Sequence, residues 1–209
     1  MNIIVFGSTG GTGRQIIQQA LDTGHSVTAV ARNPATLNVQ HPRLRLVKAD
    51  VLQLPEFEQV VQNQDVVLSA LGWRSKKDVF VYSQGVGNIV AAMEKYGVRR
   101  ILCVSAAAVQ TNPKLSFIFR VATKLLQRIF KSAYANILSM ENLLQSSELD
   151  WTVVRPPRLT NAALKGKYRF SINEWLARCH FISRADLAHF MLHHVSDRNS
   201  FQSIVEVAY

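Results

Sequence analysis

Three glycines near the beginning of the chain have the spacing of a phosphate-binding turn. Gly7, Gly10 and Gly13 follow the apolar run 3–6 and precede residues 14–21, where apolar side chains recur at helical spacing. Glycine permits a tight turn, a close approach of backbone N–H groups to a pyrophosphate, and close packing of a helix on a strand. The order of strand, glycine turn and helix therefore predicts a dinucleotide-binding unit, with an ordinary loop as the alternative.

Arg32 directly follows the predicted second strand, residues 27–31. At this place in dinucleotide folds a carboxylate suits the ribose 2′-hydroxyl of NAD, whereas an arginine suits the 2′-phosphate of NADP. No acidic residue lies nearby, so Arg32 predicts NADP (NADPH) as the cofactor. The alternative is a solvated arginine on a basic surface.

The loops that leave other predicted strands hold further candidates. In open α/β sheets, ligands bind outside the carboxyl ends of the strands. Residues that follow the strands predicted at 44–47, 65–69 and 151–155 are therefore expected to line the cofactor cleft. These residues are Asp50, Ala70, Leu71, Gly72, Trp73, Arg74 and Pro156. Arg74 is suited to hold an anion, and a solvated loop arginine is an equal alternative.

Strand and helix patterns alternate along most of the chain. Further strands are predicted at 101–105 and 203–208, and further helices at 54–62, 82–96 and 187–195, the last after a capping box with Ser183 as N-cap. This alternation with short loops is typical of a doubly wound parallel sheet. No repeat or linker interrupts it. We expect a single-domain α/β Rossmann fold over residues 1–209, with a small C-terminal substrate-side lobe whose elements lie within 110–180.

The composition limits the class of protein. The chain has 209 residues, of which 48% are hydrophobic and 18% charged, as in an ordered globular protein. It contains no apolar run of membrane-spanning length, and the first predicted strand begins at residue 3. We therefore expect no signal or transit peptide and predict a cytoplasmic protein.

Cysteines and histidines give little indication of a metal site. Cys103 and Cys179 lie far apart without the spacing of a zinc or redox motif, and Cys103 falls in a predicted strand. His189 and His193 are four residues apart, and Asp186 precedes His189 by three, a spacing that zinc could use. Because no HExxH pattern accompanies them, ordinary packing histidines are the main interpretation and no metal is predicted.

A basic amphipathic segment, residues 114–131, lies within the mainly helical region 114–145. Two adjacent apolar stripes and a set of cations recur in it at helical spacing: Ile118, Val121, Leu125 and Ile129; Phe119, Ala122, Leu126 and Phe130; and Arg120, Lys124, Arg128 and Lys131. Such a helix can lie on a membrane surface, contact another protein, cover the substrate cleft or pack on its own domain. The net charge of +10 attracts anionic partners, but no helix-turn-helix or zinc module indicates specific nucleic-acid binding.

Several motifs together resemble a known family. They are GSTGGTGR at 7–14, RNP at 32–34, KADV at 48–51, SALG at 69–72, SMENLLQSS at 139–147, WTVVRPP at 151–157 and ISRADLA at 182–188. Over essentially its full length the chain resembles the atypical short-chain dehydrogenase/reductases. Within that group it is most similar to the biliverdin-IXβ reductase/flavin reductase type and to NAD(P)H-binding, NmrA-like proteins. The resemblance implies a Rossmann fold and a nicotinamide cofactor but leaves the substrate open.

The resemblance also implies roles for individual residues. The pyrophosphate would be held by the turn that contains Gly7, Thr9, Gly10, Gly11, Thr12 and Gly13. Arg32 would bind the 2′-phosphate, and Asp50 and Val51 would face the adenine side. Leu71, Gly72 and Arg74 would lie near the nicotinamide.

Two features distinguish the chain from relatives that reduce ketones. Ser105 follows the family's fifth strand, but the next residue is Ala106 where many relatives carry a second hydroxyl that faces the nicotinamide. Ordinary members also use a tyrosine with a lysine four residues later, and no tyrosine here has one. Ser105 and Tyr134 remain as predicted catalytic residues, with Arg158 as a further polar candidate near the acceptor.

Two functions fit these observations. The first is an NADPH-dependent reductase that transfers hydride to a conjugated small-molecule acceptor such as a flavin, quinone or tetrapyrrole, because such acceptors need orientation more than a protein acid. The positive charge of the chain suits an anionic acceptor. The second is a non-catalytic NADP(H)-binding redox sensor of NmrA-like type, which Ala106 and the missing Tyr–Lys pair favour. Residues 114–131 would then contact a membrane or a partner protein. We favour the reductase, because the proton can come from water.

Overall fold

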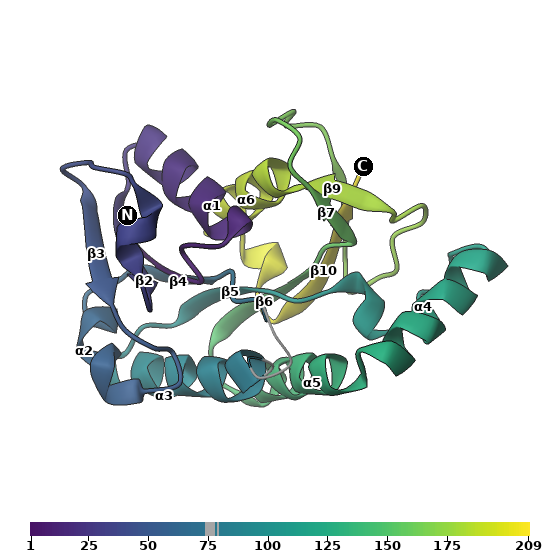
Figure 1. Cartoon of the computed structure of the whole chain (residues 1–209), viewed down its shortest axis with the longest axis horizontal. Coiled ribbons are helices and arrows are strands. Elements are labelled where there is room, and N and C mark those ends of the chain that lie inside the picture. Colours follow the sequence, from purple (N-terminus) through teal and green to yellow (C-terminus); the bar gives the residue numbers. More distant parts are fainter. Residues whose placement is uncertain (74–77, 79) are drawn as a thin grey trace.

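A mostly parallel sheet forms the centre of the computed structural model, which describes residues 1–73, 78 and 80–209 (Figure 1). The strands run in the order β3 (Leu44–Lys48), β2 (Ser26–Ala31), β1 (Asn2–Phe6), β4 (Val66–Ser69), β5 (Arg100–Val104), β6 (Asp150–Arg155), β10 (Ser203–Ala208) and β8 (Arg169–Ile172). β1 is central and apolar, and the side chains of Ile3–Phe6 are buried on both faces. The strand order reverses between β1 and β4, and that reversal creates a crevice at the carboxyl ends of the two strands.

Helices cover both faces of the sheet (Figure 1). One face carries α1 (Gly11–Asp22) and α6 (Arg184–His193), and the other carries α2 (Glu58–Val61), α3 (Val86–Tyr96) and α5 (Lys131–Ser146). Each side has its own buried apolar cluster against the sheet. The predicted doubly wound α/β Rossmann fold is therefore confirmed.

Several predicted helices differ in detail. The helix predicted at 82–96 begins as a π-helical turn, Val81–Gly85, and continues as α3, while the one predicted at 54–62 is a 3-10 turn at Leu54–Glu56 followed by the single turn of α2. The long helical region 114–145 divides into α4 (Phe117–Ile129) and α5 because the backbone of Phe130 leaves helical geometry (φ −107°, ψ 32°).

None of the helices in the described part of the chain combines the length and apolarity needed to cross a membrane.

The C-terminal third contributes more to the main sheet than we predicted. β10 pairs in parallel with β6, and the short strand β8 adds to β10 in antiparallel orientation. The substrate-side lobe is consequently small and includes the separate two-stranded sheet of β7 (Arg158–Thr160) and β9 (Phe181–Ser183).

Ser183 is the N-cap of α6, as predicted, and its hydroxyl accepts a hydrogen bond from the Asp186 N–H (2.9 Å). The Asp186 carboxylate does not complete a capping box but accepts from the N–H groups of Lys165 and Gly166 and from the Tyr209 hydroxyl. Although burial opposes its ionisation, these hydrogen bonds hold the pKa of Asp186 below its ordinary value.

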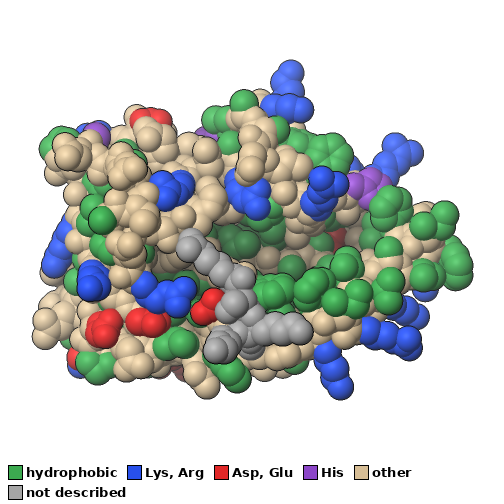
Figure 2. Space-filling model, in the orientation of Figure 1, with side chains coloured by type: hydrophobic (Ala, Val, Ile, Leu, Met, Phe, Trp, Pro, Cys, Tyr) green, Lys and Arg blue, Asp and Glu red, His purple; other side chains and the backbone are tan. Residues whose placement is uncertain are grey.

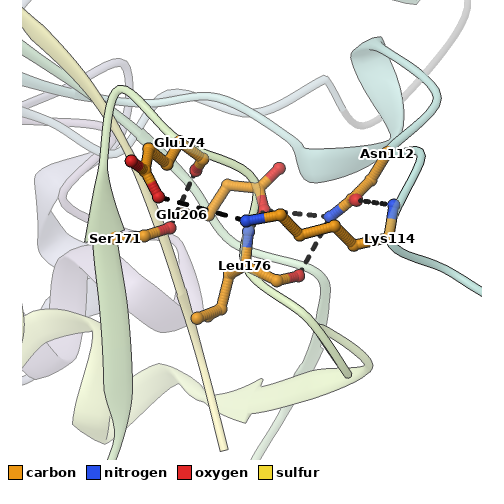
Figure 3. Close-up of polar contacts among 6 residues, drawn as sticks. All are labelled: Asn112, Lys114, Ser171, Glu174, Leu176 and Glu206. Atoms are coloured by element: carbon orange, nitrogen blue, oxygen red, sulfur yellow. Dashed lines mark hydrogen bonds and ion pairs between the residues drawn. The ribbon is translucent and has the colours of Figure 1, made fainter.

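Glu206 of β10 ties the loop that precedes α4 to the main sheet (Figure 3). Its Oε2 accepts hydrogen bonds from the N–H of Leu176 (2.7 Å) and from Nδ2 of Asn112 (3.1 Å), while Oδ1 of Asn112 accepts from the N–H of Lys114 (2.8 Å). Oε1 of Glu206 is buried and has no partner in the described part of the chain. Burial raises the pKa of Glu206, an effect opposed by the Leu176 N–H and by the charges of Arg155 and Lys114.

The raised pKa makes stability depend on pH with a definite sign. Between the ordinary glutamate value of 4.5 and the raised value, the folded state holds a proton that the unfolded chain has lost, so the free energy of unfolding falls as pH rises. Glu206→Gln removes this titration and keeps an acceptor for Leu176 and Asn112. We expect the stability of the variant relative to the parent to increase with pH over this interval and then level off.

Urea unfolding at a series of pH values from about 4 to 8 measures this difference. Glu174→Gln is the matched control, because Glu174 is exposed and lies 4.0 Å from Nζ of Lys114. If the free energy of unfolding changed with pH equally in the parent and in the Glu206 variant, the raised pKa of Glu206 would be contradicted.

Candidate functional site

A cleft of about 660 Å³ opens at the carboxyl ends of the parallel strands, a volume suited to a cofactor. Most of the residues predicted to bind the cofactor line this cleft: Gly7, Thr9, Gly10, Gly11, Thr12, Arg32, Asp50, Val51, Ala70, Leu71 and Gly72. Trp73, Tyr82, Ser105 and Arg184 line it as well. Arg74 lies outside the described residues. The cleft thus brings together segments that are far apart in the sequence.

Backbone packing at the glycine turn requires glycine at two positions. Gly7 has φ +73°, and a Cβ there would lie 2.4 Å from the carbonyl oxygen of Ala70. A Cβ on Gly13 would lie 2.3 Å from the carbonyl oxygen of Gly7, which explains why Gly13 supports the cleft without lining it. At Gly10 the corresponding distance to the Gly7 carbonyl oxygen is 3.2 Å, so this position is less crowded.

The beginning of α1 provides an anion-binding environment. Its N-cap is Gly10, and among the described residues no side chain caps the helix, so the N–H groups of its first turn can serve a ligand. The Arg184 side chain lies beside this turn, because a Cβ on Gly11 would lie 2.6 Å from Cδ of Arg184. Nη1 of Arg184 donates to Oδ1 of Asn161 (2.7 Å). The helix terminus and this guanidinium together fit a pyrophosphate.

Arg32 and Asp50 line the cleft from the loops that follow β2 and β3. The Arg32 side chain is 58% exposed, and its Nη1 lies 3.5 Å from Oδ1 of Asp78. Oδ1 of Asp50 accepts a hydrogen bond from the N–H of Leu52 (3.0 Å), which fixes the turn after β3. Val51 packs so closely on Gly85 that a Cβ there would lie 2.9 Å from Cγ1 of Val51. A charged side chain and a fixed turn are thereby available for a ribose and its base.

A second cavity of about 320 Å³ lies beneath α4. Tyr134 and Pro156 line this cavity and are absent from the lining of the cleft, although Pro156 was predicted to bind the cofactor. The Pro156 carbonyl accepts a hydrogen bond from the N–H of Ala107 (2.9 Å), which continues the parallel pairing of β5 and β6 past the ends of both strands. The other lining residues are mostly apolar and include Ala106, Leu115, Phe119, Leu126 and Pro157.

Ser105 stands at the boundary between the two cavities, since it lines the cleft while Ala106 lines the second cavity. Its hydroxyl donates to Oε1 of Glu141 (2.5 Å). Glu141 is 1% exposed and forms a two-point ion pair with Arg155, Nε to Oε1 at 2.9 Å and Nη2 to Oε2 at 2.5 Å. Because the hydroxyl hydrogen is directed at Glu141, Ser105 offers the cleft a lone pair and not a proton.

Sequence reasoning missed Arg184, Glu141 and Arg155 as parts of the site. The sequence held a signal for the ion pair. Glu141 occurs among the apolar residues that α5 buries, and Arg155 ends a buried strand. Charged side chains at buried positions are almost always paired. Arg184 lies in the motif at 182–188, but its place beside the glycine turn depends on how α6 packs on α1.

Two tyrosines face the cavities. Tyr134 is half-buried in the wall of the second cavity, and burial raises its pKa. Burial also raises the pKa of Tyr82 in the cleft, although a backbone hydrogen bond at Trp73 opposes the shift. Both hydroxyls therefore hold their protons at neutral pH more tightly than a free tyrosine does, and they can donate hydrogen bonds.

The histidines of α6 take part in packing. The Tyr168 hydroxyl and Nδ1 of His189 are 2.8 Å apart, and the His189 ring stacks on His193 at 3.8 Å between centroids. Burial and the neighbouring His193 lower the pKa of His189. Within the described residues no group of three His, Cys, Asp or Glu side chains could hold a metal ion. The thiols of Cys103 and Cys179 are free and buried.

Gly13→Ala is expected to destabilise the fold, because its Cβ would collide with the backbone at Gly7. The size of the effect is about 1–3 kcal/mol, as for other forced overpacking. Gly87→Ala is the control: its Cβ would make an ordinary 3.6 Å contact with Leu143, and alanine favours a helix by about 1 kcal/mol. Thermal unfolding of both variants measures the difference, and equal melting temperatures would contradict the packing argument.

Glu141→Ala is expected to lower the free energy of unfolding by about 3–5 kcal/mol, because it leaves the buried guanidinium of Arg155 without its partner. The exposed Glu94→Ala is the control and should change stability by less than about 0.5 kcal/mol. Denaturant unfolding measures both. The double variant Glu141→Leu/Arg155→Met should recover much of the loss, and a double variant as unstable as Glu141→Ala would refute the interpretation.

Comparison with known proteins agrees with this geometry. Residues 7–198 match the NAD(P)H-binding family model. An uncharacterised chloroplastic protein of Arabidopsis thaliana is 31% identical over 175 residues, covering 76% of this chain and 59% of that protein. The chloroplastic divinyl chlorophyllide a 8-vinyl-reductase of the same plant is 26% identical over 231 residues, covering 99% and 53%. The chain thus spans little more than half the length of these two relatives.

Solved structures share the fold. A wide-type short-chain dehydrogenase/reductase from Veillonella parvula in complex with NADP has a TM-score of 0.84 at 19% identity, covering 100% of this chain and 94% of that one. An oxidoreductase from Lactococcus lactis has a TM-score of 0.82 at 21% identity, covering 100% and 90%. The chain shares the fold of these short-chain dehydrogenase/reductase and oxidoreductase structures and belongs to the NAD(P)H-binding family.

Proposed function

We propose that this protein is an NADPH-dependent reductase that delivers hydride to a conjugated acceptor, a flavin, quinone or tetrapyrrole. The observation that carries the proposal is the mostly apolar second cavity that adjoins the cofactor cleft at Ser105 and Ala106. An acceptor bound there would lie next to the end of the cleft where the resemblance places the nicotinamide.

The residues of the cleft suit each part of the cofactor. The N–H groups at the start of α1 and the guanidinium of Arg184 would bind the pyrophosphate, and Arg32 the 2′-phosphate. The Arg32–Asp78 contact is long, 3.5 Å, and the Arg32 side chain is 58% exposed, so exchanging this contact for one with a phosphate costs little. When bound, NADPH supplies the hydride.

The second cavity is suited to a flat, conjugated molecule. Phe119, Leu126 and Pro157 offer apolar surface, and Arg158 in the same lining can attract an anionic substituent. Hydride addition to a conjugated centre leaves a delocalised negative charge that takes its proton from water or from the Tyr134 hydroxyl. Ser105 is not needed as an acid, which agrees with the direction of its hydroxyl.

A relative supports a reductive role. The plant protein that matches 99% of this chain is, by its name, a reductase of divinyl chlorophyllide a. A tetrapyrrole-type acceptor is therefore one of the three classes to test first.

NADPH oxidation followed at 340 nm, about where reduced nicotinamide absorbs, tests the proposal with FMN, a soluble quinone and biliverdin in turn. We expect turnover with at least one of them and a reduced rate in Tyr134→Phe. Tight NADPH binding without turnover of any acceptor would favour the alternative of a redox sensor.

Arg32→Ala is expected to weaken NADPH binding by about 10–100-fold and to leave NADH binding nearly unchanged, because only NADPH carries the 2′-phosphate. Arg45→Ala removes the same charge from β3, outside the residues that line the cleft, and serves as the control. Fluorescence titration with both nucleotides gives the affinities. Equal losses of affinity for NADPH and NADH would show that Arg32 does not bind the 2′-phosphate.

A further inference from the structure

The outer face of α4 is apolar and uncovered in the described part of the chain. Large apolar side chains three or four residues apart are strongly exposed along it: Phe117 77%, Ile118 77%, Val121 50%, Leu125 57% and Ile129 61%. Figure 2 shows hydrophobic side chains gathered where α4 lies, at the right of the view. A continuous apolar surface of this kind marks a site of interaction.

The opposite face of α4 already packs on the protein. Phe119, Thr123 and Leu126 line the second cavity, and Nε2 of Gln127 donates to the carbonyl of Ala108 (2.9 Å). The Phe119 ring lies 4.5 Å from the ring of His180. The exposed apolar face is therefore not the side by which the helix attaches to its own domain.

Cations lie beside the exposed apolar face. Arg120, Lys124 and Arg128 follow one another at four-residue intervals and are exposed, as is Lys131 at the start of α5. Figure 2 shows Lys and Arg side chains along the lower edge of this region. Residues 114–140 include no Asp or Glu. The surface therefore combines large apolar side chains with uncompensated positive charge.

We propose that α4 docks this protein on an anionic lipid bilayer. The apolar face would enter the boundary between headgroups and acyl chains, and the neighbouring cations would contact the lipid phosphates, as in other interfacial helices. An anionic bilayer complements both properties of the face, whereas a second copy of this basic chain, with a net charge of +10, would repel it.

The attachment of α4 suits this role. Figure 1 shows α4 extending away from the sheet beyond the end of α5. The hydrogen bonds of Asn112 with Glu206 and Leu176 fix the loop before it (Figure 3). The apolar face is thus presented by an anchored helix. Docking requires no turnover, so it stands independently of the proposed reductase activity.

Flotation with vesicles tests the proposal on the full chain. Vesicles of phosphatidylcholine with and without 30% phosphatidylglycerol, a composition of about one anionic lipid in three, are compared in low salt and in 0.5 M salt, where the Debye length falls to a few ångströms. We expect binding to the anionic vesicles, weaker binding to the neutral ones, and partial release by salt.

Two variants separate the apolar from the electrostatic contribution. Ile118→Ser/Leu125→Ser should reduce binding to anionic vesicles by more than tenfold, and Lys124→Gln/Arg128→Gln by about thirtyfold. Leu164→Ser, at an exposed loop position, and Arg43→Gln/Arg45→Gln, on the sheet edge, are the matched controls. Unchanged melting temperatures show that the variants are folded.

Failure of the parent protein to bind anionic vesicles, or equal binding by the Ile118/Leu125 variant, would overturn the proposal. A dimer in the absence of lipid that the Ile118/Leu125 variant abolishes, without vesicle binding by the parent, would assign the face to a second copy instead. Sedimentation velocity of the parent and the variant distinguishes that case.

Discussion

The candidate site depends on the close approach of the glycine turn to the backbone around it. Gly13 packs on the carbonyl of Gly7, and Gly7 packs on Ala70, so the beginning of α1 meets the ends of β1 and β4 without intervening side chains. This contact brings the first N–H groups of the helix to the cleft and positions the loop after β4 as its wall. Arg14 extends the arrangement, because its guanidinium donates to the carbonyls of Thr36 and Leu37 and so secures the segment after Arg32.

The buried ion pair of Glu141 and Arg155 affects the chemistry of the site as well as its stability. The Glu141 carboxylate of this pair accepts the hydroxyl hydrogen of Ser105, the residue that stands at the boundary between the two cavities. A hydroxyl that already donates to a carboxylate cannot protonate a substrate without losing that bond. Chemistry that needs little proton donation from the protein, such as hydride transfer to a conjugated acceptor, fits this arrangement better than reduction of a ketone.

The sequence predicted those features that depend on short-range pattern. Apolar runs and the GxxGxxG spacing were sufficient for the central strands and for the turn that holds Gly7 and Gly10, because local sterics dictate both. The pattern could not reveal that Arg184 lies beside Gly11, or that Tyr134 and Pro156 line a second cavity, since helix packing and loop direction decide those places.

The direction of α4 shows why amphipathicity alone cannot place a helix. Its two apolar stripes adjoin, so the periodicity is compatible with either stripe facing the domain. The polar groups decide: Thr123 is the one described residue of α4 that is buried, and Gln127 binds a backbone carbonyl, so neutral polar side chains mark the inner side. Phe119 and Leu126 of one stripe line the second cavity on that same side, whereas the stripe of Ile118, Val121, Leu125 and Ile129 points outward. Exposure of that face opposes stability in water, whereas an apolar environment at the same position would remove the cost, which is the physical basis of the docking role proposed for it.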